Sequence, residues 1–274
     1  MSSMAQSARR TASRTRNSSL LKGLTRGGFV GYGLLHLAVA WLALQIAFRH
    51  ASQEGSQSGA FQLLAHQPLG RPLLVVIAIG LLAMAVWQLL EAAIGHRDES
   101  GGRRVAERVF SAARTVIYGV LAWTAWRVQS GAPTSSANQQ EQATAGILTH
   151  PAGRVLVVIA ALVVLAVGIG MVVYGARRMF ERRLYTGRMS YSTRRLVVGL
   201  GQAGYIAKGI AFGIVGLLVF GAAVRKDAGS STGLDGALHT LAGKPYGQLL
   251  LIAVAAGFAA FGAYCFFQSR YRKV

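Results

Sequence analysis

The chain has 274 residues, of which 53% are hydrophobic and 14% are charged, and its formal net charge is +20. Soluble domains usually carry about 25% charged residues, so the composition argues against an ordinary soluble protein. The basic residues flank apolar stretches and form no stripe interleaved with aromatic residues, which argues against a nucleic-acid partner. The single cysteine, Cys265, excludes an intramolecular disulfide.

Six apolar stretches follow one another along the chain. They cover residues 28–48, 71–92, 109–126, 154–176, 197–224 and 248–268. Most have about 20 residues, which at about 1.5 Å per residue matches a hydrocarbon core of about 30 Å. The sequence therefore predicts an all-α membrane protein with six transmembrane helices.

The charged segments divide the chain into a tail, three helix pairs and two linkers. The tail (1–26) is basic and rich in Ser and Thr, so we expect it to be disordered in the cytoplasm, although an organellar transit peptide has a similar composition. The helix pairs are predicted at 27–94, 109–176 and 196–274, the last ending in a short basic C-terminus. Basic cytoplasmic linkers at 95–108 and 177–195 join the three pairs.

The distribution of basic residues predicts the orientation of the helices. The tail, the segments 95–114 and 177–195 and the C-terminus hold 21 Lys and Arg residues, whereas the segments inside the helix pairs hold 7. Cytoplasmic segments carry the excess of Lys and Arg in membrane proteins. We therefore expect a multi-pass plasma-membrane protein with both termini in the cytoplasm, and we expect its basic linkers to bind anionic lipid headgroups.

A repeated Pro-x-Gly motif opens the second helix of each pair. Its three copies are Pro68 and Gly70, Pro151 and Gly153, and Pro245 and Gly247. We expect the proline to start the helix, where its missing N–H costs little, and the glycine to permit close approach of the chain. A short amphipathic helix on the outer membrane surface is predicted just before each copy.

The first helices of the pairs align as well, at Tyr32 and Gly33, Tyr118 and Gly119, and Lys208 and Gly209. Each repeat has two spans, so all three repeats insert with the same orientation. This parallel arrangement predicts a pseudo-three-fold axis along the membrane normal, unlike the inverted repeats of many transporters.

These motifs resemble those of the bacterial membrane family catalogued as domain of unknown function 1206. The family pattern is similar to Gly-Tyr-x-x-(Arg/Lys)-Gly in the first helix of a pair and Pro-x-Gly before the second. Residues 204–209 fit it best, residues 28–33 have Tyr32 in place of the basic residue, and the middle copy keeps only Tyr118 and Gly119. The resemblance covers about residues 24–272. It implies three pairs of transmembrane helices and brings no known activity.

Three aligned polar residues are candidates for a site inside the membrane. Lys208 lies 17 residues before Arg225, which is about 25 Å along a helix and places it near the cytoplasmic boundary. Tyr32, Tyr118 and Lys208 would act there as interfacial anchors, the lysine extending to the lipid surface. Alternatively, they form a polar cluster around the pseudo-three-fold axis, such as a pore mouth or a lipid-headgroup site.

Two further polar residues in the spans are His36 and Glu91. His36 lies one helical turn after Tyr32 on the same face, where an interhelical hydrogen bond is expected and a proton or ligand role is the alternative. Glu91 reaches the cytoplasmic boundary, and we expect it to pair with Lys208 or with a linker arginine.

Chemistry is less evident than architecture. The sequence lacks the catalytic motif His-Glu-x-x-His and has no pair of membrane-embedded carboxylates, so we expect no enzyme, cofactor or metal site. The favoured hypothesis is a structural, accessory or interaction protein of the plasma membrane, with an unidentified membrane-protein partner. The alternative is a small-solute or ion transporter or channel that uses the polar cluster near the axis.

Overall fold

The computed structural model describes residues 19–48, 53–95, 101–132, 134–225, 227–231 and 233–273. These residues form nine α-helices and three short 3-10 helices, and their only β-type pairing is the bridge between Leu184 and Arg272. The predicted all-α class is confirmed for this part of the chain. Most of the predicted tail, residues 1–18, lies outside it.

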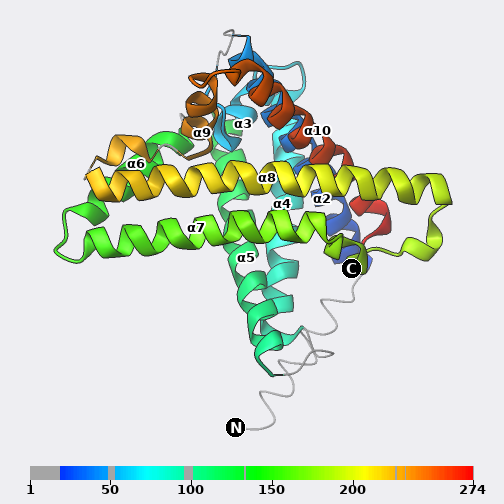
Figure 1. The fold of residues 1–274 in the computed structure, drawn as a ribbon. Coiled ribbons are helices and arrows are strands. Elements are labelled where there is room, and N and C mark those ends of the chain that lie inside the picture. Colours follow the sequence, from blue (N-terminus) through cyan, green and yellow to red (C-terminus); the bar gives the residue numbers. More distant parts are fainter. Residues whose placement is uncertain are drawn as a thin grey trace.

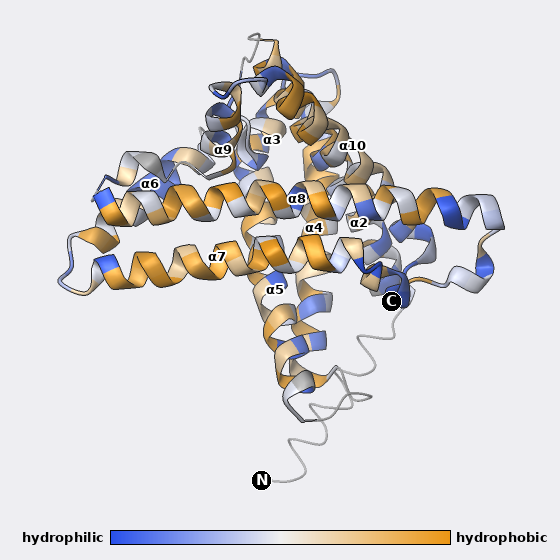
Figure 2. Ribbon diagram, viewed as in Figure 1, coloured by the Kyte–Doolittle hydropathy of each residue, from blue (hydrophilic) through white to orange (hydrophobic). Residues whose placement is uncertain are grey.

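Six long helices follow the apolar stretches. They are α2 (Ser19–Ala47), α4 (Gly70–Ile94), α5 (Gly101–Gln129), α7 (Gly153–Ala176), α8 (Tyr191–Arg225) and α10 (Gly247–Tyr271). Among the described helices, five are long and apolar enough to cross a membrane, and α5 is not one of them. The charges of Arg104, Glu107, Arg108 and Arg114 lower the mean hydropathy of α5. Figure 2 shows hydrophobic residues along most of α7 and hydrophilic residues gathered near the C-terminal end.

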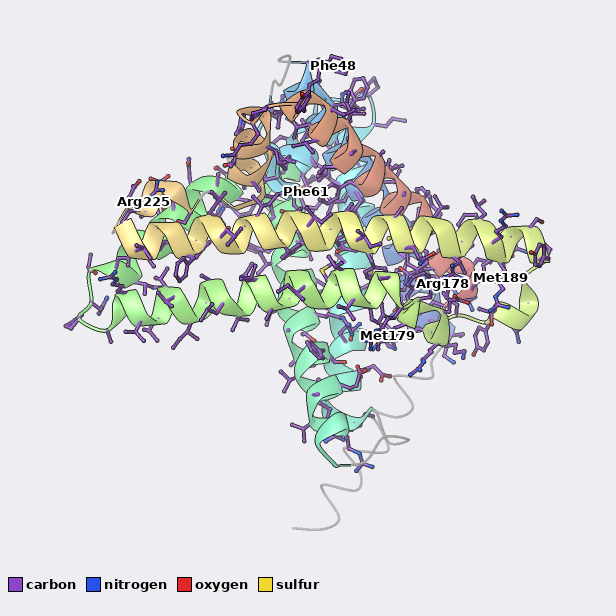
Figure 3. All side chains as sticks on the ribbon, in the orientation of Figure 1. Phe48, Phe61, Arg178, Met179, Met189 and Arg225 are labelled. Atoms are coloured by element: carbon purple, nitrogen blue, oxygen red, sulfur yellow. The ribbon has the colours of Figure 1, made fainter. Side chains whose placement is uncertain are left out.

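One short helix precedes the second long helix of each pair, as the sequence predicts. These short helices are α3 (Gln57–Ala65), α6 (Ser136–Leu148) and α9 (Gly233–Ala242). Phe61, on α3, is fully buried against the long helices, and Figure 3 shows it near the centre of the molecule. Leu238 of α9 lies in the same cluster, so α3 and α9 are part of the packed core, whereas α6 buries only Ala137 and Thr144.

The Pro-x-Gly motif forms a tight turn ahead of the helix, which corrects the expectation that proline starts the helix. In each copy the glycine N–H donates to a carbonyl three residues earlier: Gly70 to Gln67 at 2.9 Å, Gly153 to His150 at 2.9 Å and Gly247 to Lys244 at 2.8 Å. The proline therefore occupies the second position of a β-turn, where its fixed φ is favoured. The helices α4, α7 and α10 begin on the glycine itself.

The glycine of the motif is required by close chain approach. A Cβ added at Gly70 would overlap the carbonyl oxygen of Leu64, and one at Gly153 would overlap that of Ile147. In the first and third copies the middle residue, Leu69 or Tyr246, has a left-handed conformation with φ of 62° or 61°. The signature therefore encodes a sharp corner between a short helix and a long helix.

Helices from different repeats make the most extensive contacts. α2 packs along α10, α4 along α5, and α7 along α8. Within a repeat, α2 contacts α4 and α8 contacts α10, whereas α5 and α7 do not pack together to a comparable extent. The contacts between long helices thus run in the order α5, α4, α2, α10, α8 and α7, and this series is open between α5 and α7. In Figure 1, α7 and α8 run side by side across the direction of α4 and α5.

Glycines set the spacing at these junctions. A Cβ added at Gly33 of α2 would lie 2.8 Å from the oxygen of Gly262 in α10, and one at Gly209 of α8 would lie 2.6 Å from the oxygen of Gly168 in α7. A Cβ added at Gly204 of α8 would lie 2.7 Å from the Cα of Phe261 in α10. Small residues allow membrane helices to pack backbone to backbone.

The two sets of connecting segments lie at opposite ends of the bundle. At one end the segment after α7, with η1 (Met179–Arg183) and η2 (Thr186–Arg188), meets the C-terminal residues: the N–H of Tyr185 donates to the oxygen of Tyr271 at 2.8 Å. At the other end α3, α6, α9 and η3 (Ala228–Ser230) gather. Figure 3 shows Arg178 and Met189 at one end of the α7–α8 pair and Arg225 at the other.

The glycine contacts predict unequal effects of one substitution at two neighbouring positions of α8. Gly209→Ala should lower the free energy of unfolding by about 1–3 kcal/mol, because the new Cβ overpacks against α7. Gly213→Ala should leave it unchanged or raise it by up to about 1 kcal/mol through helix propensity, since a Cβ there meets nothing within 4 Å. Unfolding of the purified protein in detergent micelles measures both. Equal effects of the two substitutions would contradict the packing.

Candidate functional site

Three of the five candidate residues meet inside the bundle. The ammonium nitrogen of Lys208, from α8, lies 3.0 Å from Nε2 of His36 and 3.1 Å from the hydroxyl of Tyr32, both from α2. Lys208 is 7% exposed and His36 is 4% exposed. The lysine therefore does not extend to the lipid surface, which corrects the expectation of an interfacial anchor, and the polar-cluster alternative describes its geometry.

Hydrogen bonding in α2 determines the state of the imidazole. Nδ1 of His36 lies 2.8 Å from the backbone carbonyl oxygen of Tyr32, one turn earlier. A carbonyl can only accept, so Nδ1 carries the hydrogen and Nε2 is left as an acceptor for Lys208. The histidine is neutral in this arrangement, and the lysine is the donor.

An aromatic ring covers the third side of the ammonium group. The nitrogen of Lys208 lies 4.0 Å from the ring centroid of Phe261 in α10, within the range of a cation–π contact. The three N–H bonds of the ammonium group therefore have three partners: an imidazole nitrogen, a phenol oxygen and an aromatic face. The enclosure can hold a positive charge without water.

The cluster joins all three repeats at their aligned position. Tyr118 of α5 packs edge-on against Tyr32, with 5.5 Å between ring centroids, and Tyr32 contacts Lys208. The equivalent residues of the first, second and third repeats thus form one connected group near the centre of the bundle. Glu91 lies elsewhere, half-buried in the last turn of α4, while Lys208 makes its hydrogen bonds to α2.

Sequence reasoning missed Phe261 as a member of the cluster. Phe258, Phe261 and Tyr264 recur every three residues along α10 and are all buried. An aromatic row with helical spacing is typical of a core, and nothing in the spacing indicates that one ring covers a lysine. The nearest signal was Gly204, because its contact with the backbone of Phe261 brings α10 close to α8.

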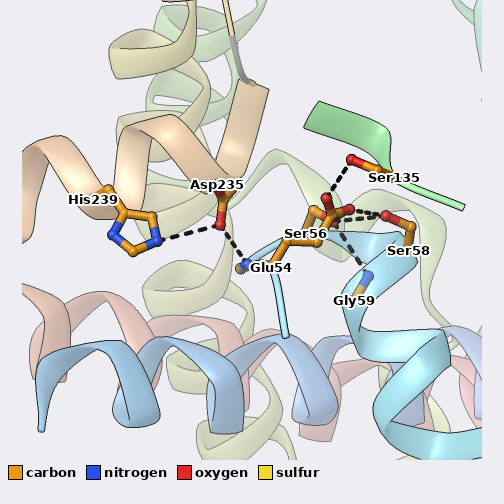
Figure 4. A network of polar contacts seen from close by, with 8 residues as sticks. Glu54, Ser56, Ser58, Gly59, Ser135, Asp235 and His239 are labelled. Atoms are coloured by element: carbon orange, nitrogen blue, oxygen red, sulfur yellow. Dashed lines mark hydrogen bonds and ion pairs between the residues drawn. The ribbon is translucent and has the colours of Figure 1, made fainter. Parts of the chain in front are cut away.

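A second polar network, also missed, joins the short helices at the other end (Figure 4). The carboxylate of Glu54 accepts hydrogen bonds from the hydroxyls of Ser56, Ser58 and Ser135 and, at 2.9 Å, from the N–H of Ser136. Ser56 and Ser135 are the N-caps of α3 and α6. A carboxylate is favourable there because helix N-termini expose unpaired N–H groups.

The same segment reaches the third short helix. The N–H of Gly55 donates to Oδ1 of Asp235, in the first turn of α9, at 2.6 Å, and Nε2 of His239 lies 3.5 Å from that oxygen. Glu54 and Gly55 therefore hold the starts of α3, α6 and α9 together. The network has a structural explanation and leaves the Lys208 cluster as the site of interest.

Comparison with known proteins agrees with this architecture. The family described as Domain of Unknown Function (DUF1206) matches residues 27–95, 110–178 and 203–272. The chain is 28% identical over 255 residues to "Uncharacterized protein YxxB" of Bacillus subtilis (strain 168), an alignment that covers 93% of this chain and 92% of that protein. No solved structure matches the chain. Each matched segment holds one pair of long helices and one residue of the aligned set Tyr32, Tyr118 and Lys208, so the chain belongs to the DUF1206 family.

Proposed function

We propose that this protein is a six-span plasma-membrane protein with both termini in the cytoplasm, and that it acts as a non-catalytic interaction protein. Its main contact in this proposal is with anionic lipid headgroups, which bind at the basic end of the bundle. A membrane-protein partner remains a prediction of the sequence.

The observation that carries the proposal is the convergence of the basic segments. The segments assigned to the cytoplasm hold 21 basic and 4 acidic residues, against 7 and 4 in the outer segments. Described parts of three of these segments meet at one end, where Lys273 donates from its N–H to the oxygen of Arg183 and Arg183 pairs with Glu107 at 2.8 Å. A basic surface beside an anionic leaflet gains about 1 kcal/mol for each Lys or Arg near the membrane.

The sixth span of the proposal is α5. It packs along α4, which is apolar enough to cross a membrane. Its exposed side chains are apolar over several turns, and they include Val109, Val116, Ile117, Val120 and Trp123. A face of this kind is expected to contact lipid, which supports a transmembrane position despite the charges nearer its N-terminus.

The Lys208 cluster fits a structural connection between repeats better than a transport path. Its hydrogen-bond donors are used within the protein. The two described cavities lie at the outer end of the bundle, and neither is lined by Lys208, His36 or Tyr32. One observation favours the transporter alternative: a buried amine and an imidazole 3.0 Å apart inside a membrane are a plausible relay for a proton.

Lipid composition should change the stability of the protein through its basic end. In nanodiscs, replacing zwitterionic phosphatidylcholine with anionic phosphatidylglycerol should raise the melting temperature. A variant with Arg177→Gln, Arg182→Gln and Arg195→Gln should lose most of that gain, at about 1 kcal/mol for each arginine. All three side chains are exposed.

The matched control removes three exposed charges from the other end, through Arg154→Gln, Arg225→Gln and Lys244→Gln. This variant should keep the full response to anionic lipid. Equal losses in both variants would show that the response reflects net charge alone, and the proposal would fail.

A double-mutant cycle tests whether the cluster is a structural connection. His36→Leu should lower the free energy of unfolding by about 1–3 kcal/mol, because it removes one of the two hydrogen-bond acceptors of the buried ammonium group. Lys208→Met should be close to neutral, since an apolar side chain of similar length replaces a charge that is costly to bury. The double variant should regain most of the stability that His36→Leu loses. Urea or detergent unfolding measures all four proteins.

Additive effects of the two substitutions would mean that Lys208 and His36 are not coupled. The transporter alternative predicts a different result, in which Lys208→Met keeps its stability but abolishes a solute or proton flux measured in proteoliposomes.

A further inference from the structure

A groove of about 550 Å³ lies at the outer end of the bundle, where α3 and α6 meet the ends of α4 and α5. Its volume is within the range of about 300–1,000 Å³ that is usual for small-molecule sites. Polar side chains make up much of its lining, namely Gln62, His66, Arg71, Thr134, Asn138 and Gln139. The groove is separate from the Lys208 cluster and from the basic end.

The charges around the groove favour an anionic ligand. Arg71 and His66 are the ionisable side chains among the described lining residues, and none of those residues is a carboxylate. The nearest acid in the adjoining network, Glu54, already accepts hydrogen bonds from Ser135 and from the N–H of Ser136. The guanidinium group of Arg71 is therefore available to bind an oxyanion, for which its planar donors are well suited.

One buried donor in the groove lacks a partner. Thr134 is 7% exposed, and its hydroxyl makes no hydrogen bond within the described part of the chain. Its carbonyl oxygen, by contrast, accepts from the side-chain amide of Gln62. Buried hydroxyls nearly always have a partner, and an exception calls for an explanation such as a missing ligand. Rotation of the Thr134 side chain toward the groove would let a ligand oxygen supply that partner.

The size of the groove and its amide side chains indicate which chemical groups accompany the anion in the ligand. A bare phosphate ion would fill little of the volume, while Asn138 and Gln139 offer both donors and acceptors for hydroxyl groups. Arg71 is the second residue of α4 and immediately precedes its apolar run. The groove therefore opens where that helix enters the hydrocarbon core, within reach of lipid headgroups and of dissolved solutes.

We propose that this groove binds a hydroxyl-bearing organic phosphate of the glycerophosphate class, with Arg71 contacting the phosphate and the hydroxyl of Thr134 donating to a ligand oxygen. The phosphate belongs either to a free solute or to a lipid headgroup.

Two probes distinguish these sources. Glycerol 3-phosphate is titrated by calorimetry against the full chain in phosphatidylcholine nanodiscs, and phosphatidylglycerol retention is measured by native mass spectrometry. Arg71→Gln should weaken the binding of whichever of the two probes the wild type binds at least tenfold. Arg154→Gln is the matched control, because Arg154 holds the equivalent place after Pro151 and does not line the groove; it should bind as the wild type does.

Thr134→Val supplies an independent readout. The substitution removes a hydroxyl that has no hydrogen-bond partner among the described residues, so the melting temperature without ligand should not fall. Affinity for the probe should decrease about tenfold. A variant that melts lower without ligand and binds normally would show that the hydroxyl serves the fold.

Binding of glycerol 3-phosphate that depends on Arg71 supports a solute site, and binding of phosphatidylglycerol alone that depends on Arg71 supports a headgroup site. Failure of both probes to bind, or equal affinities for Arg71→Gln and Arg154→Gln, would overturn the proposal. Neither result depends on lipid binding at the basic end, because the arginines tested there are different residues.

Discussion

The fold depends on the absence of water from the hydrocarbon core, which forces each buried polar group to find its partner within the protein. Backbone groups meet this constraint by forming long helices. Lys208 meets it through His36, Tyr32 and Phe261, which come from two other helices. Because these partners come from the first and third repeats, satisfying one amine also fixes how those repeats pack. Polar groups without such an enclosure are placed at the two ends of the bundle.

The repeat produces an open series of packed helices in which neighbours from different pairs pack most closely. Glycines at the junctions bring backbones together, as Gly209 and Gly168 do between α8 and α7. The corner formed by each Pro-x-Gly turn sets the direction in which the second helix of a pair leaves its short helix. Repetition of these turns and close contacts along the chain maintains the architecture. The residues at the aligned position, Tyr32, Tyr118 and Lys208, differ in chemistry. The repeat thus explains the corners and the short helices, and the single lysine provides the departure from the repeat that defines the candidate site.

The long helices, the short helices and the corners between them could be predicted, because length, hydropathy and a threefold motif are local properties of the sequence. The alignment of Tyr32, Tyr118 and Lys208 indicated that the three residues occupy equivalent places, and the structure connects them in one group. The enclosure of Lys208 could not be predicted, because spacing along α2 puts His36 on the face of Tyr32 but does not say which helix faces it. The same is true of Glu54, whose partners Ser135 and Ser136 are some 80 residues away in sequence. The position of each proline in the turn before the helix was also missed, because the fixed φ of proline suits both a turn and the first residue of a helix.

The central claim is that all three repeats cross the membrane twice in the same direction, which requires α5 to span it. Two fusions test this together: a reporter active only outside the cytoplasm inserted after Ala132, and one active only inside it fused after Val274. The account predicts that both are active, because three spans precede Ala132 and six precede Val274. If α5 does not cross the membrane, both positions change sides and both reporters are silent, which would contradict the account.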